Sequence, residues 1–63
     1  MTAAEVRRVR MRLRLTQAQL AAKLGVHEMT VSRWERGTVN VPEPVARLIR
    51  YVASNARERR KEG

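Results

Sequence analysis

Two glycines, Gly25 and Gly37, divide the middle of this chain into two short segments with the spacing of helices. The first segment starts at Thr16, and Gln19 follows three residues later, which is the pattern of a capping box at a helix N-terminus. Glycine is the usual residue at a left-handed helix end, so we expect one helix to end at Gly25 and the next, over residues 28–36, to end at Gly37. Only about three residues remain to connect the two helices.

A connection this short makes two helices meet at a steep angle, which is the helix-turn-helix arrangement. Ala21 is small and lets the two helices approach closely. The apolar residues expected to form the core between them are Leu20, Leu24, Val26, Val31 and Trp34. The spacing therefore predicts a helix-turn-helix over residues 16–37.

Two further helices are predicted on either side of this unit. Residues 3–13 carry a stripe at helical spacing, formed by Val6, Val9, Arg10 and Leu13. Pro42-Glu43-Pro44 opens a fourth helix, because proline is tolerated in a first turn. Its apolar stripe continues to about residue 56 through Val45, Leu48, Ile49, Val52 and Ala56. The sequence has no alternating strand pattern, so we expect an all-α fold, a compact bundle of four short helices with at most a poorly formed fifth.

The sequence predicts one domain over residues 1–56 and a charged tail over residues 57–63, which we expect to fray. A chain of 63 residues approaches the lower size at which a single core folds without disulfides or metal. There is no cysteine and only one histidine, so we expect no disulfide, no structural metal and no cofactor. No apolar run is long enough to span a bilayer, and we expect a cytoplasmic protein with no membrane partner.

The net charge is +8, from 14 Lys and Arg against 6 acidic residues, and nearly all the cations are Arg. Such an imbalance favours a polyanionic partner, nucleic acid before an anionic membrane surface. RNA binding is disfavoured, because the chain has no Phe and no aromatic platform on which bases could stack. An enzyme is disfavoured too, because there is no Cys, no Asp and no paired-carboxylate arrangement, and so small a core leaves little room for a pocket.

The segment LTQAQLAAKLGVHEMTVSRWERG, residues 15–37, resembles the helix-turn-helix of phage-repressor and Cro-type proteins, the XRE family. The matching residues are Leu15, Thr16, Gln17, Leu20, Ala21, Leu24, Gly25, Val26, Val31, Trp34, Glu35 and Gly37. The resemblance covers about residues 5–52. It implies a sequence-specific transcriptional regulator, Cro-like or repressor-like and of phage or bacterial origin. Such a protein binds double-stranded DNA with the helix over residues 28–36 in the major groove.

The resemblance implies that the outer face of this helix contacts bases. Arg33 would donate two hydrogen bonds to guanine, and Met29 would lie against a thymine methyl group. Glu28 would accept a hydrogen bond from cytosine or orient Arg33. Ser32 is small enough to allow close approach and would bond a base or a phosphate. The alternative for each of these side chains is plain solvation.

The resemblance also implies contacts to the DNA backbone. Free N–H groups at a helix N-terminus attract anions, and Thr16 and Gln17 occupy the helix end that clamps a phosphate in relatives. Asn40 matches a backbone-contacting position in the following loop, and Arg36 lies at a helix end suited to a phosphate. His27 stands where relatives usually have a Ser or Thr cap, and its imidazole would meet a phosphate.

Arg10 belongs to the apolar stripe of the first helix, so its guanidinium points at the core, which is costly unless the charge is paired. Glu35 lies at the edge of the buried face of its helix, and we expect a bidentate ion pair between the two, a pairing also found in relatives. The alternative is an Arg10 side chain that extends to solvent. The remaining arginines of this helix, Arg7, Arg8 and Arg12, would add long-range attraction to DNA or form a solvated face.

Besides His27, two further positions depart from the family pattern. Relatives commonly have Gly with a positive φ where this chain has Arg14, so we expect either a strained residue, at a cost of about 1 kcal/mol, or a differently shaped connection. Relatives are often basic where this chain has Glu43, and we expect fewer phosphate contacts there.

A single recognition module binds weakly, so we expect a homodimer, at least on DNA, with two copies on an inverted-repeat operator. The candidate dimer contacts are Tyr51, Val52 and Ala56, and the alternative role of Tyr51 is to cap the core. The alternative function is an antitoxin-type autoregulator that also binds a partner protein. In that case only residues 54–63 are left for the partner.

Overall fold

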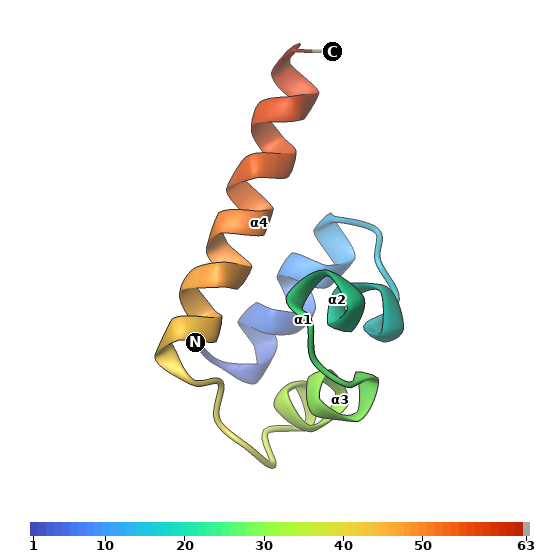
Figure 1. The fold of residues 1–63 in the computed structure, drawn as a ribbon. Helices are drawn as coiled ribbons and strands as arrows, with labels where there is room; N and C mark the ends of the chain where they lie inside the picture. Colours follow the sequence, from blue (N-terminus) through green and yellow to red (C-terminus); the bar gives the residue numbers. More distant parts are fainter. Residues whose placement is uncertain (63) are drawn as a thin grey trace.

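The structure, a computed structural model, describes the backbone of residues 1–62 and the side chains of residues 1–55. Its helices are α1 (Ala3–Arg12), α2 (Gln17–Leu24), α3 (Glu28–Arg36) and α4 (Glu43–Glu62) (Figure 1). No strand occurs over residues 1–62, and the prediction of an all-α fold is confirmed. The same residues contain no fifth helix.

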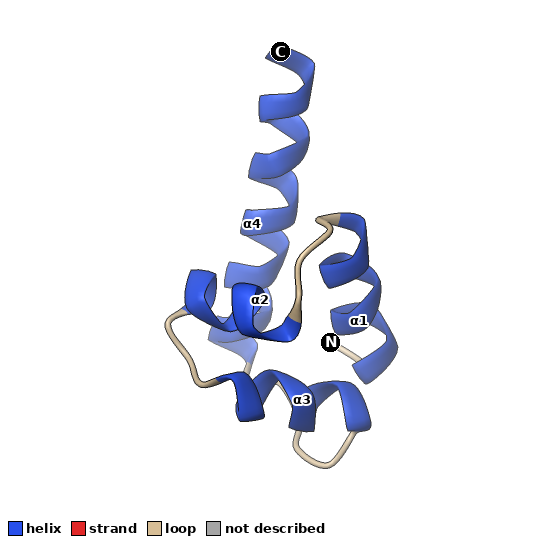
Figure 2. Ribbon diagram, turned by 90° about the vertical axis from the view of Figure 1, so that its right-hand side faces the viewer, coloured by secondary structure: helices blue, strands red, loops and turns tan. Residues whose placement is uncertain are grey.

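The helix-turn-helix formed by α2 and α3 has the helix ends that the sequence predicts. Thr16 and Gln19 form a reciprocal capping box, with N···O distances of 3.1 Å from the Gln19 amide to the Thr16 hydroxyl and 2.9 Å from the Thr16 amide to the Gln19 side chain. Gly25 and Gly37 adopt left-handed φ angles of 74° and 75° at the two C-terminal ends. A short connection joins the end of α2 to the start of α3, which lies below α2 in Figure 2.

One fully buried side chain from each helix forms the centre of the core. These side chains are Val6, Leu20, Val31 and Ile49, each with no exposed surface. Trp34 of α3 is 3% exposed and packs against them. Burying a side chain of this size stabilises a fold by about 1.5–3 kcal/mol. Because all four helices contribute, α3 is held in place by the whole domain and not by α2 alone.

The chain leaves α1 through a left-handed residue that is not glycine. Arg14 has a φ of 58°. The Leu15 amide donates to the Arg10 carbonyl at 3.1 Å, and the Arg14 amide donates to the Met11 carbonyl at 3.0 Å. This pair of bonds is the hydrogen-bond pattern of a left-handed helix end. Of the two outcomes expected at Arg14, the structure therefore has the strained one.

The fourth helix is longer than the sequence predicts. An end near residue 56 was expected, whereas α4 continues to Glu62. The physical reason is that Ala, Arg, Glu and Lys dominate this region and favour a helix, with no Gly or Pro after Pro44 until Gly63. In both views α4 extends away from the other helices, while α3 lies at the opposite end of the molecule (Figures 1 and 2). The division into a domain over residues 1–56 and a frayed tail over residues 57–63 stays a prediction.

Neither a membrane-spanning helix nor a metal-binding cluster occurs among the described residues. Within the described residues, no helix combines the length and the apolar character needed to cross a membrane. The same part of the chain brings together no group of three or more His, Cys, Asp or Glu residues that could hold a metal ion.

Candidate nucleic-acid interface

The third helix presents a polar and basic face to solvent. Val31 and Trp34 turn its other face into the core. The outward residues Met29, Arg33 and Arg36 are exposed, and Met29 keeps 51% of its surface accessible although it is apolar. An exposed Met on the same face as two arginines is unusual for a face that serves only solvation, and it gives the helix both an apolar and a cationic contact surface.

The four predicted base-contacting residues all lie on α3. Glu28, Met29 and Arg33 are exposed, and Ser32 is half-buried. Neither Glu28 nor Arg33 forms an ion pair with another residue of the described part of the chain. Both charged groups are therefore available to a ligand.

His27 caps the N-terminus of α3. Its Nδ1 accepts a hydrogen bond from the Met29 amide at 3.0 Å. Because Nδ1 accepts in this cap, Nε2 is the ring nitrogen left to donate. His27 is exposed, so this Nε2–H can donate to an anion while Nδ1 holds the cap.

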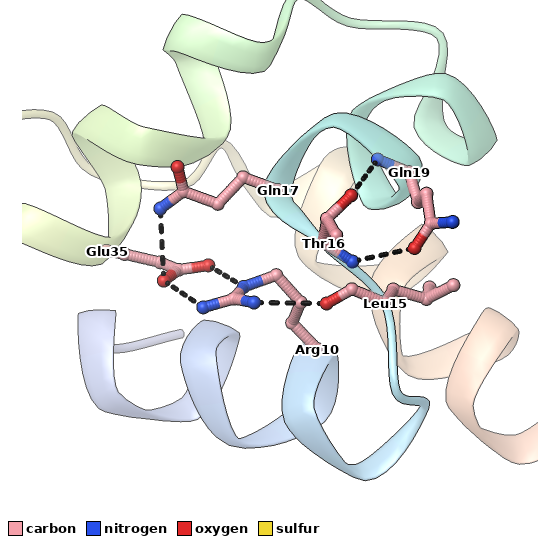
Figure 3. A network of polar contacts seen from close by, with 6 residues as sticks. All are labelled: Arg10, Leu15, Thr16, Gln17, Gln19 and Glu35. Atoms are coloured by element: carbon pink, nitrogen blue, oxygen red, sulfur yellow. Dashed lines mark hydrogen bonds and ion pairs between the residues drawn. The ribbon is translucent and has the colours of Figure 1, made fainter.

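A polar network ties α1, α2 and α3 together behind the outer face of α3 (Figure 3). Arg10 donates to Glu35 through two nitrogens, with distances of 2.6 Å from Nε to Oε2 and 3.0 Å from Nη2 to Oε1. Its third donor, Nη1, reaches the Leu15 carbonyl at 3.0 Å. The Arg10 and Glu35 side chains are only 18% and 7% exposed. The structure thus contains the bidentate pair that the helical spacing predicts, and Arg10 does not extend to solvent.

The ionisation of Glu35 depends on this network. Burial by itself raises the pKa of the carboxyl group, because a desolvated carboxylate is less stable. Hydrogen bonds from Arg10 and Gln17, together with the positive charges of Arg10 and Arg7, outweigh burial and hold the pKa of Glu35 below its usual value. The hydrogen bond to Glu35 likewise raises the pKa of Arg10. Both partners are charged at neutral pH.

Gln17 has a contact that sequence reasoning missed. Its side-chain Nε2 donates to Glu35 Oε1 at 3.4 Å, so the side chain lies between α2 and the C-terminal end of α3. Helical spacing does not indicate this contact, because it depends on how closely α2 approaches the end of α3. Thr16 satisfies the amide of Gln19. The amides of Gln17 and Ala18 are then the first-turn donors left for an anion at this helix end.

The remaining predicted contacts to the DNA backbone lie at the C-terminal end of α3, opposite the His27 cap. Arg36 is exposed in its last turn, and Asn40 is exposed in the loop that leads to α4. Figure 1 shows this loop, between α3 and α4, at the same end of the molecule as α3. Glu43, at the start of α4, has ion-pair distances of 3.7 Å to Arg47 and 3.8 Å to Arg50 and is exposed. The predicted contact residues therefore extend along α3 from its N-terminal cap to the loop beyond its C-terminus.

A helix-turn-helix core with an exposed basic third helix defines a small DNA-binding domain. A family model described as helix-turn-helix matches residues 6–49, which is more than half of the chain. The protein belongs to this family of DNA-binding transcriptional regulators, the XRE type that includes Cro and the phage repressors. The family is regulatory and not enzymatic. Comparison with curated proteins and with solved structures finds no match.

Proposed function

We propose that this protein recognises a specific operator and regulates transcription there, with α3 in the major groove. The observation that carries this proposal is the outer face of α3, where Glu28, Met29 and Arg33 are exposed on a helix whose other face is anchored in the core. An acceptor, an apolar group and a bidentate donor are the chemical types that distinguish base pairs in that groove.

Each of these side chains has a matching base edge. Arg33 donates to O6 and N7 of a guanine, which is the commonest specific contact to DNA. Met29 packs against a thymine methyl group, and Ser32 bonds a base or an adjacent phosphate. Glu28 accepts from the amino group of a cytosine or orients Arg33. A good bidentate contact discriminates against the wrong base by about 1–3 kcal/mol.

Contacts to phosphate fix the position of α3 in the groove. We assign them to the α2 N-terminus at Thr16 and Gln17, to the Nε2–H of His27, to Arg36 and to Asn40. The net charge of +8 supports this assignment, because it favours binding to a polyanion before any specific contact forms.

A homodimer on an inverted repeat completes the proposal. Two recognition helices would lie about 34 Å apart, one turn of the duplex. The candidate contact lies on α4, where Tyr51 is 65% exposed and Leu48 is 40% exposed. Val52, on the same side of the helix, is half-buried. Ala56, the other residue predicted there, lies outside the residues whose side chains are described.

The experiment that tests this function is a selection of bound sites from a pool of random duplex DNA. It is run with the wild-type protein, with Arg33→Ala and with Arg12→Ala as the matched control. Arg12 is an exposed arginine of α1 outside the interface, so its loss changes the net charge equally. We expect a two-fold symmetric consensus for the wild type and the control. Arg33→Ala should relax the preference at one position in each half-site.

The other outcomes are equally informative. An asymmetric single half-site would retain specific DNA binding and remove the symmetric dimer. Binding without any enriched sequence would overturn the proposal that the protein is a sequence-specific regulator. It would favour the antitoxin-type alternative, in which a partner protein gives the biological specificity.

A further inference from the structure

Three arginines of α1 form no ion pair within the described residues, and they lie on two different sides of the helix. They are Arg7, Arg8 and Arg12. Arg7 precedes Arg10 by three residues, so the two side chains share a side of α1. That side faces α3, because Arg10 spans the gap to Glu35. Helical spacing places Arg8 and Arg12 on the opposite side of α1. The charge of Arg7 also contributes to the lowered pKa of Glu35, which agrees with a position near the end of α3.

The charges near this junction do not balance. Glu35 is already bonded by both Arg10 and Gln17. Arg7 is exposed and forms no ion pair with any residue of the described chain. Arg36, also exposed, follows Glu35 in the last turn of α3. Arg7 and Arg36 therefore both carry positive charge that no carboxylate of the described residues pairs, and both are free to bind an anion.

The half of α1 that contains Arg7 is the half nearer to the level of α3. In both views α1 begins near the level of α3 and rises away from it toward its C-terminus (Figures 1 and 2). Arg7 belongs to the first half of α1. Its long side chain can therefore reach an anion that lies alongside α3.

We propose that Arg7 contacts a DNA phosphate and extends the interface from α3 onto α1. Arg8 and Arg12 make no such contact and act only through the net charge of the protein. This inference rests on the proposed function, because it needs α3 in the groove. The inference gives Arg7 a role in DNA binding that differs from the role of Arg8 and Arg12, although all three belong to α1.

The test compares Arg7→Ala with Arg8→Ala and Arg12→Ala, three variants that each remove one positive charge from α1. Binding is measured against salt concentration on two probes, the duplex selected by the wild-type protein and a random-sequence duplex. Each phosphate contact contributes about 0.9 to the slope of log K against log salt. We expect a slope shallower by about 0.9 for Arg7→Ala, so its affinity defect should shrink by about 3.5-fold when salt rises fourfold. Arg7→Lys should keep the wild-type slope.

Circular dichroism and the random-sequence duplex keep the outcomes distinct. Circular dichroism at the assay temperature checks that each variant is folded, because Arg7 lies near the Arg10–Glu35 pair. If the three alanine variants have the same slope and affinity, Arg7 acts only at long range and the inference is wrong, although the proposed function stands. If the wild type shows no preference for the selected duplex over the random one, the proposed function fails, and the random duplex still reports whether Arg7 contacts a phosphate.

Discussion

Arg14 occupies a backbone conformation that strains any residue with a side chain. Its φ of 58° costs an L-residue about 1–2 kcal/mol relative to Gly. We predict that Arg14→Gly raises the free energy of unfolding by about 1 kcal/mol or slightly less, because Gly also gains entropy in the unfolded chain. Urea denaturation measures the difference. Arg14→Ala removes the charge but keeps the strained backbone, so it should show no comparable gain. Equal stability of the Gly and Ala variants would contradict this explanation.

His27 has one ring nitrogen that caps α3 and one that we propose donates to a DNA phosphate. Loss of a capping side chain costs about 1 kcal/mol, so His27→Ala should be destabilised by roughly that amount. His27→Ser restores an acceptor for the Met29 amide and should recover the stability. Neither variant retains the Nε2–H, so both should bind DNA more weakly than the wild type. If the Ser variant recovered DNA binding as well as stability, the imidazole would serve only as a cap.

At the scale of helices, the Arg10–Glu35 pair decides how α1 and α3 are held. Glu35→Gln leaves the half-buried guanidinium without its counter-charge and should cost about 3 kcal/mol, the low end of the range for buried pairs. Replacing both partners, with Arg10→Met and Glu35→Leu, should recover most of that loss, because no unpaired charge remains. Urea denaturation of Arg10→Met, of Glu35→Leu and of the double variant gives the coupling energy between the two side chains. Glu43→Gln is the matched control, because Glu43 is 65% exposed in its ion pairs and should cost less than about 1 kcal/mol.

The same pair predicts how stability depends on pH. The pKa of Glu35 in the folded protein lies below its usual value of 4.5, so the unfolded chain binds its proton first as the pH falls. The stability that Glu35 contributes is complete above about pH 4.5 and is lost as the pH falls through the lower folded value. We expect the urea midpoint to be nearly constant from neutral pH to about 5 and to decrease below that.

The control for this pH dependence must remove a second carboxyl group. Hydrogen bonds from the Thr2 amide and hydroxyl lower the pKa of Glu5, so Glu5 acts in the same direction. Glu5→Gln should therefore retain most of the acid sensitivity, whereas the Arg10→Met, Glu35→Leu double variant should lose most of it. An acid-induced loss of stability that survives in the double variant would assign it to another group.

The sequence predicts those features of the fold that local chemistry determines. Capping residues and glycines define α2 and α3, because a helix end needs partners for its amides or a left-handed residue. The Arg10–Glu35 pair follows from helical spacing and from the cost of a buried charge. The Gln17 contact does not follow, because it depends on how closely α2 approaches the end of α3. The conformation of Arg14 does not follow from local chemistry either. It depends on how the next residue, Leu15, packs against the core.

At the scale of the whole molecule, the proposed recognition face and the exposed apolar pair of α4 lie on different helices. The recognition face on α3 carries cations and one exposed Met, and it lies at the end of the molecule opposite to the C-terminus of α4 (Figure 1). The exposed apolar residues of α4, Leu48 and Tyr51, are three residues apart and so share one side of that helix. A second copy can therefore contact α4 without covering α3.

The last prediction concerns this contact between copies. Tyr51→Ser removes an exposed aromatic side chain, the type most often found at the centre of protein interfaces, without changing the net charge. We expect the affinity for a full inverted repeat, relative to a half-site, to fall by about tenfold, which corresponds to about 1.4 kcal/mol of contact between the copies. Met11→Ser is the control, because Met11 is 60% exposed and lies on α1. Sedimentation of each complex on the full repeat gives the number of bound copies. An unchanged ratio for Tyr51→Ser, with two copies bound, would place the dimer contact away from this side of α4.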